Sequence, residues 1–84
     1  MAEPLNEKMK SLVEFLAKSL VEKPGEVVVE SKESERTVLV ELKVASEDLG
    51  RVIGKDGHTI NAIRVVLQTA AASYDKKVRL DLLS

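Results

Sequence analysis

The chain has no cysteine, a single histidine and only two aromatic residues, Phe15 and Tyr74. The absence of cysteine excludes disulfide bridges, cysteine-ligated zinc and thiol chemistry, and His58 alone does not make a histidine-rich metal site. Two aromatic side chains are too few for the base-stacking platform that many single-strand binders use. We therefore expect no metal and no cofactor.

Long hydrophobic runs are also missing, and the unbroken aliphatic stretches are short, such as 27–29 and 38–40. This pattern excludes a membrane span and the core of a signal peptide, and it favours a cytoplasmic protein. With 84 residues, 44% hydrophobic and 32% charged, the chain has the size and composition of one small folded domain, which we place at residues 1–84.

The net charge of −1 hides an asymmetry between the two parts of the chain. Residues 1–49 contain 7 basic and 11 acidic side chains, whereas residues 50–84 contain 6 basic and 3 acidic ones. A protein that coats nucleic acid by charge alone is usually more basic than this. Any contact with a polyanion is therefore expected to be local and to lie in the second part of the chain.

Helical spacing of apolar residues predicts a first helix at 4–22 and a last helix from about 57 to 74. A short helix between them is expected to begin at 46–48, where Ser46 is placed to cap its free N–H groups. The stripe that should face the core is Leu5, Met9, Leu12, Val13, Leu16 and Leu20 in the first helix, and Ile60, Ile63, Val66, Leu67, Ala70 and Tyr74 in the last.

Alternating apolar residues predict three strands, at 26–31, 36–44 and 78–82, with a polar turn at 32–35 between the first two. The predicted fold class is therefore α+β, in the order helix-strand-strand-helix-helix-strand, with the helices packed on one face of a three-stranded sheet.

Three apolar residues fall outside the predicted core: Phe15, Val28 and Leu39. They are candidate contacts for a symmetric dimer, because burying them would stabilise a domain with a thin core. For Leu39 an isolated position on the surface is the favoured interpretation, and a contact patch is the alternative.

The most informative segment is 51–60, RVIGKDGHTI, which places GKDG between the two later helices. Gly54 and Gly57 allow a tight turn and the close approach of an anion, because neither has a Cβ atom. The next helix directs its free N–H groups and positive dipole end at the same point, and Lys55 adds a mobile positive charge. Two glycines at this spacing also suit a plain helix–turn–helix corner. The interpretation therefore depends on the isoleucines that flank the glycines and on the helices on either side. We interpret the segment as a phosphate-contacting loop.

The sequence VIGKDGHTI resembles the signature of the KH domain, an RNA-binding module whose GxxG loop clamps the nucleotide backbone. The order of elements is similar to the type II arrangement. The stretch 49–57, followed by Ala62, Ile63 and Arg64, resembles more narrowly the small bacterial proteins of the KhpA family, in which one KH domain makes up nearly the whole chain. The resemblance covers almost all of the sequence and is most specific from Leu49 to Ala71.

The resemblance implies binding of single-stranded RNA, a homodimer, and a partnership with a larger multidomain KH protein of the KhpB type. It also implies an RNA chaperone or post-transcriptional regulator linked to cell elongation, cell shape and envelope (peptidoglycan) homeostasis. His58 and Asn61 depart from the family pattern, which often has arginine or lysine there. The expected RNA-binding residues are Arg51, Ile53, Gly54, Lys55, Asp56, Gly57, His58, Ile60, Asn61 and Arg64.

Several of these residues have a second interpretation. Asp56 is placed to cap the last helix, and His58 to be a solvated residue at its start. Arg51 is either a surface residue or a flank of the anion site, and Arg64 either forms a salt bridge to the sheet or contacts RNA. Ile53 and Ile60 are expected to be core residues whose outer edges floor the groove for the bases. Lys76 and Lys77 are expected to form only a solvated turn.

An enzyme is not expected, because the glycines do not fit a P-loop and no catalytic triad or metal cluster is present. The alternative function is an assembly scaffold that mainly pairs with the larger KH partner and binds RNA weakly on its own.

Overall fold

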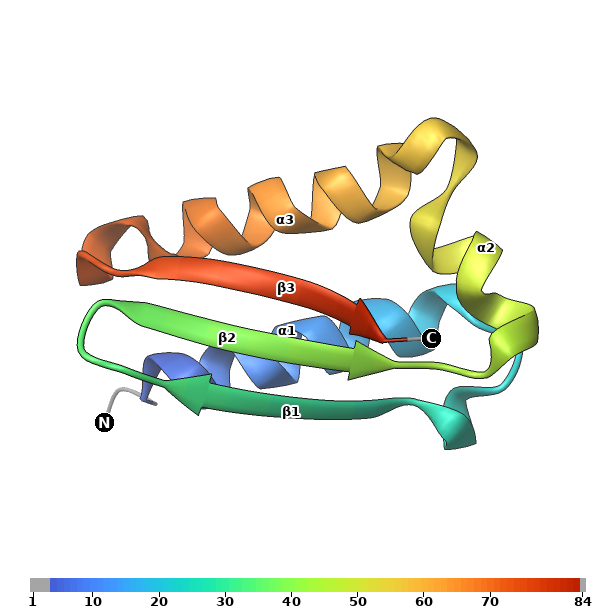
Figure 1. The fold of residues 1–84 in the computed structure, drawn as a ribbon, viewed down its shortest axis with the longest axis horizontal. Coiled ribbons are helices and arrows are strands. Elements are labelled where there is room, and N and C mark those ends of the chain that lie inside the picture. The colour runs from blue at the N-terminus through green and yellow to red at the C-terminus, as the bar shows by residue number, and fades with distance from the viewer. Residues whose placement is uncertain (1–3, 84) are drawn as a thin grey trace.

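A computed structural model describes residues 4–83 of the chain. Its six regular elements follow the predicted order (Figure 1). The helices and strands are α1 (Leu5–Leu20), β1 (Val28–Glu33), β2 (Thr37–Lys43), α2 (Leu49–Ile53), α3 (His58–Ala71) and β3 (Lys77–Leu83). Short 3-10 turns occupy Pro24–Glu26, Ser46–Asp48, Lys55–Gly57 and Ala72–Tyr74.

The three strands form one sheet in the order β1-β2-β3. β1 and β2 are an antiparallel hairpin, in which Glu33 pairs with Val38. β3 pairs in parallel with β2, because the chain crosses back through α2 and α3 before it enters the sheet. β3 is therefore an edge strand, and α3 lies along it (Figure 1).

The core lies between this sheet and the two long helices, which confirms the predicted α+β class. Alternate strand residues point into it, and the other face of the sheet is not covered by any described element (Figure 1). The strands contribute Val29, Val38, Val40, Leu42, Val78 and Leu80, α1 contributes Leu5, Met9, Val13 and Ala17, and α3 contributes Ile60, Ile63, Leu67 and Ala71.

Two residues assigned to the helical stripes lie at the surface instead. Leu20 is 36% exposed, because α1 ends there and the chain becomes extended at Val21. Val66 is 46% exposed, because the stripe of α3 that meets the sheet is narrow. Ala17 and Ala71 are buried although neither was assigned to a stripe, and the buried face of α3 includes Ala71 rather than the half-buried Ala70.

Some predicted boundaries were also wrong. β1 begins at Val28 rather than at 26, because Pro24–Glu26 is wound into a 3-10 turn. The hairpin turn is centred on 34–36, where the Ser34 N–H donates to the Thr37 carbonyl at 2.8 Å. Ser46 does not cap a helix: Ala45 takes the N-cap position, and the Ser46 hydroxyl donates to Glu47 at 3.0 Å.

Candidate nucleic-acid interface

The loop Gly54–Gly57 joins α2 to α3 and projects at one end of the molecule (Figure 1). Gly54 has φ +75°, a conformation that L side chains rarely adopt. A Cβ atom on Gly54 would lie 2.2 Å from Thr59 Oγ1 and 2.9 Å from the Thr59 backbone nitrogen. Thr59, in the first turn of α3, therefore packs directly on the loop and makes glycine necessary at position 54. Thr59 was not among the predicted site residues, because its own residue type gave no signal.

The second half of the loop is also left-handed. Asp56 has φ 55° and Gly57 has φ 76°. Asp56 is one of the few non-glycine types that tolerate this region. The prediction that Asp56 caps α3 was wrong, because Gly57 is the N-cap and no side chain caps the helix. The Asp56 carboxylate instead remains exposed at the tip of the loop.

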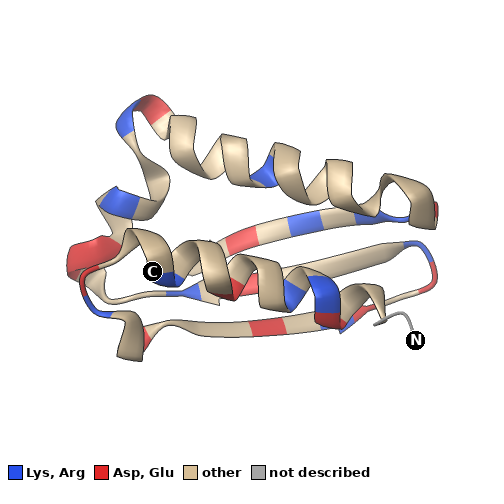
Figure 2. Cartoon of the chain, turned by 180° about the vertical axis from the view of Figure 1, so that it is seen from behind, with Lys and Arg blue, Asp and Glu red and all other residues tan. Residues whose placement is uncertain are grey.

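Four polar residues are exposed around this tip: Lys55, Asp56, His58 and Asn61. They surround the first turn of α3, a helix of 14 residues whose N-terminus carries a partial positive charge. Figure 2 shows a basic and an acidic segment next to each other at the loop, and few charges along the rest of α3. The arrangement can attract an anion through Lys55 and the helix end, and Asp56 opposes that attraction.

The two isoleucines that flank the loop have different environments. Ile60 is 6% exposed and belongs to the core, as expected. Ile53 is 38% exposed, so its assignment to the core was wrong. It is the last residue of the five-residue α2, whose buried position is Val52. Ile53 thus offers an apolar surface directly beside Gly54.

Arg51 is directed away from the loop toward acidic residues. Its guanidinium donates to the Glu22 carboxylate, and its Nε atom lies 3.6 Å from Oδ1 of the buried Asp48. The side chain of a helical residue leans toward the N-terminus of its helix, which agrees with this direction. Contact of Arg51 with RNA stays a prediction, and the observed partners favour its other interpretation.

Arg64 faces the sheet but forms no salt bridge within residues 4–83. It donates to the Leu80 carbonyl at 3.2 Å and to Asn61 Oδ1 at 3.3 Å. Gln68, one turn further along α3, donates to the Val78 carbonyl. These bonds satisfy carbonyls on the open edge of β3. An open hollow of about 300 Å³ lies here, lined by Arg64, Gln68, Val78, Arg79, Leu80 and Asp81.

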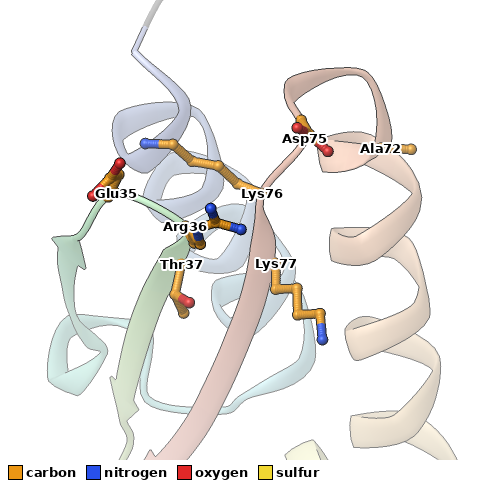
Figure 3. A pocket seen from close by; sticks show the side chains of 7 residues that line it. All are labelled: Glu35, Arg36, Thr37, Ala72, Asp75, Lys76 and Lys77. Carbon is orange, nitrogen blue, oxygen red and sulfur yellow. The ribbon is translucent and has the colours of Figure 1, made fainter.

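A larger hollow of about 750 Å³ lies between the hairpin turn and the turn that precedes β3 (Figure 3). Its lining is of mixed charge, with Glu35 and Asp75 beside Arg36 and Lys77. Lys76 is bound to the Glu33 carboxylate at 2.6 Å and to the Ser34 carbonyl at 3.2 Å. Because acids balance the bases, this hollow is a poor phosphate site, and Lys76 serves to join the two turns.

Two further features of residues 4–83 concern membranes and metal ions. No helix in this part of the chain has the length and apolar character needed to cross a bilayer. The same residues contain no group of three or more acidic or histidine side chains that is placed to hold a metal ion.

The three-stranded sheet, with α1 and α3 packed on it, and the two-glycine loop between α2 and α3 define a KH domain of the type II-like arrangement. The family model described as "KhpA/KhpB, KH domain" matches residues 10–82, and the chain belongs to that family. This confirms the resemblance found in the loop sequence.

Relatives within the family share the name "RNA-binding protein KhpA". The protein of Clostridium perfringens is 48% identical over 75 residues, covering 89% of this chain and 100% of the relative. That of Clostridium acetobutylicum is 47% identical with the same coverage, and that of Chlamydia trachomatis is 40% identical over 89% of this chain and 96% of the relative. Their names denote binding proteins, and the domain is likewise a binding module rather than an enzyme.

Solved structures of Era contain the same fold. Aquifex aeolicus Era bound to GDP·AlF4− superposes with a TM-score of 0.69 at 21% identity, over 98% of this chain and 31% of the Era chain. Era in complex with MgGDPNP and nucleotides 1506–1542 of 16S ribosomal RNA gives 0.66 at 24% identity, over 95% and 30%. This chain therefore spans about a third of Era, and the likeness concerns the fold.

Proposed function

We propose that this protein binds the backbone of single-stranded RNA through the loop Gly54–Gly57. The observation that carries the proposal is the backbone of this loop, in which Gly54 and Gly57 hold positive φ beside an exposed Lys55. A phosphate meets no Cβ atom at either glycine, and it lies at the N-terminal end of α3. The names of the relatives support RNA as the ligand.

The bases of the bound strand would lie beside the loop, over the exposed Ile53 and toward the open edge of β3. His58 and Asn61 are placed to contact the same strand, since both are exposed in the first turns of α3. Arg64 is a more distant candidate, because RNA must compete with the Leu80 carbonyl for its guanidinium.

In the cell we infer a cytoplasmic RNA chaperone or post-transcriptional regulator, formed by a single KH domain over residues 1–84. The resemblance to the KhpA proteins implies a link to cell elongation and envelope homeostasis. The family description, which names KhpB beside KhpA, supports a larger KH partner of the KhpB type. A second candidate function is a scaffold that mainly assembles with this partner, favoured by the modest net charge of −1.

The substitution Lys55→Asp tests the proposal. Both glycines remain, and Lys55 is exposed, so the free energy of unfolding should change by no more than about 0.5 kcal/mol. The phosphate would then face two carboxylates, and attraction becomes repulsion. We expect retention of total cellular RNA to be lost while the circular dichroism spectrum stays that of the parent.

Lys18→Asp provides the matched control, because Lys18 is an exposed lysine of α1. It changes the net charge equally and should keep RNA binding. If the Lys55→Asp protein is folded and retains RNA like the parent, the loop is not the RNA site and the scaffold becomes the preferred function.

A further inference from the structure

Asp48 is the only charged residue within residues 4–83 that is buried, with 2% of its surface exposed. It directly precedes α2, the short helix that leads into the loop. Its Oδ1 atom accepts the N–H of Glu22 at 3.1 Å, and its Oδ2 atom accepts the N–H of Lys23 at 3.1 Å. Both donors belong to the segment that follows α1, so one carboxylate joins the end of α1 to the start of α2.

Arg51 completes this arrangement from α2. Its Nε atom lies 3.6 Å from Asp48 Oδ1, and its guanidinium also donates to the Glu22 carboxylate. A buried carboxylate is tolerated only where hydrogen bonds and an opposite charge compensate its loss of hydration, and both are present here. We call Asp48, Arg51, Glu22 and the Lys23 N–H group the Asp48 clamp.

α2 needs such an external support because it has only five residues. A helix of this length is not stable by itself, so contacts with the rest of the molecule must determine its position. Within α2, Val52 is buried in the core, and Figure 1 shows the segment after α1 running beside this helix. Gly54 follows α2 directly and its N–H donates to the Gly50 carbonyl at 2.9 Å, so the loop starts where α2 is held.

We propose that the Asp48 clamp positions the loop Gly54–Gly57 for RNA, and that Arg51 acts as a positioning residue rather than as a phosphate ligand. The proposal rests on the proposed function for its ligand. It assigns a role in RNA binding to two acidic residues, Asp48 and Glu22, which would otherwise be expected to repel RNA.

The substitution Asp48→Asn removes one of the two carboxylate oxygens and turns an amide NH₂ toward a backbone N–H donor. We expect binding of a short single-stranded RNA to weaken about tenfold, because α2 loses a hydrogen bond to the segment after α1 and no longer fixes the position of the loop. Glu14→Gln is the matched control: it removes one acidic charge from an exposed pair with Lys18 on α1 and should not weaken binding.

Salt titration separates positioning from direct contact. Each lost phosphate contact makes the log–log slope of affinity against salt shallower by about 0.7 for a single strand. Arg51→Gln removes the positive charge beside Asp48, but the two backbone N–H bonds to the carboxylate remain and the Arg51 side chain is half exposed. The domain should therefore lose some stability and still fold, even if Asp48→Asn does not. We expect Arg51→Gln to weaken binding severalfold with an unchanged slope, whereas a shallower slope would make Arg51 a phosphate ligand and overturn the proposal.

Amide hydrogen exchange provides a readout that does not depend on RNA. In Asp48→Asn or Arg51→Gln, the amides of Gly54 and Gly57, which donate to the Gly50 and Gly54 carbonyls, should exchange faster by about tenfold, while those of the central strand β2 keep their protection. Unchanged exchange in the loop, or parental RNA affinity in a folded Asp48→Asn protein, would overturn the clamp's role. If the parent does not bind RNA while the exchange changes as expected, the proposed function fails and the structural coupling remains.

Discussion

At the scale of single residues, the loop depends on backbone conformations that most amino acids avoid. Gly54, Asp56 and Gly57 all have positive φ. An L-amino acid in this region destabilises the folded state by roughly 1–2 kcal/mol, whereas the achiral glycine does not. The two glycines differ in their surroundings, however. A Cβ atom would collide with Thr59 at Gly54, whereas at Gly57 it would meet only Asn61 Nδ2 at 3.7 Å.

We therefore expect Gly54→Ala to destabilise the domain more than Gly57→Ala does. Gly57→Ala should lower the free energy of unfolding by about 1 kcal/mol, from backbone strain alone. Gly54→Ala adds a clash with the Thr59 backbone and should exceed it by at least about 1 kcal/mol. Urea denaturation of both variants measures this difference. Equal destabilisation would show that Thr59 can move away from the new Cβ atom without a further loss of stability.

At the scale of helices and strands, periodicity predicted the order of all six elements and most of the core. Met9 and Val13 were found because apolar side chains recur every three or four residues on a buried helix face. The GKDG loop could be predicted as well, because its two glycines and the two helices that flank it are all recognised from residues close together in the sequence.

The contacts that support the loop could not be predicted in this way. Asp48 binds N–H groups 25 and 26 residues away along the chain, which no local sequence pattern indicates. Thr59 and Gln68 carry no pattern of their own, and their roles appear only when α3 is placed against the loop and β3. Long-range polar contacts of this kind depend on tertiary geometry, which apolar spacing does not encode.

One polar contact beside α2 predicts a pH dependence. A side-chain hydrogen bond from the Lys23 ammonium lowers the pKa of the Glu47 carboxyl to about 2. A lowered pKa in the folded state means that the pair stabilises the domain at neutral pH and loses its effect as the pH falls from about 4.5 toward 2. The pair is exposed, so its contribution is small.

Carboxyl NMR titration of Glu47 should give a midpoint well below the ordinary value in the parent. In Lys23→Ala the midpoint should rise toward the ordinary value of 4.5. A parent midpoint that is already ordinary would show that the ion pair does not persist in solution.

At the scale of the whole molecule, the basic residues of the second half do not gather on one surface. Lys55 lies at the loop, whereas Lys76 and Lys77 lie beside the larger hollow, where acids balance them. The phosphate-binding surface is therefore small. We expect about three phosphate contacts, a log–log salt slope of roughly −2 and an affinity near micromolar at physiological salt.

Fluorescence anisotropy with a labelled single strand at several salt concentrations measures this slope. A slope steeper than about −5 would require a much larger basic surface than the structure contains.

Self-association is a second prediction at this scale. Phe15 is exposed on α1, Val28 is exposed on the uncovered face of the sheet, and Leu39 is half-buried on that same face between Lys32 and Arg79. The three residues therefore lie on two sides of the molecule, and one symmetric contact does not bury them all. A dimer should raise the midpoint of thermal unfolding with protein concentration. A constant midpoint, together with monomer mass in sedimentation at high micromolar concentration, would argue against a dimer.

We propose that RNA binds this domain at the loop between α2 and α3. Amide chemical-shift mapping locates the binding site, because each residue reports its own change when a short single-stranded RNA is added. We predict that the largest saturable shifts occur at 54–58 and at the neighbouring Ile53, and that they vanish with Lys55→Asp. Saturable shifts confined to the uncovered face of the sheet, with the loop amides unmoved, would contradict the claim.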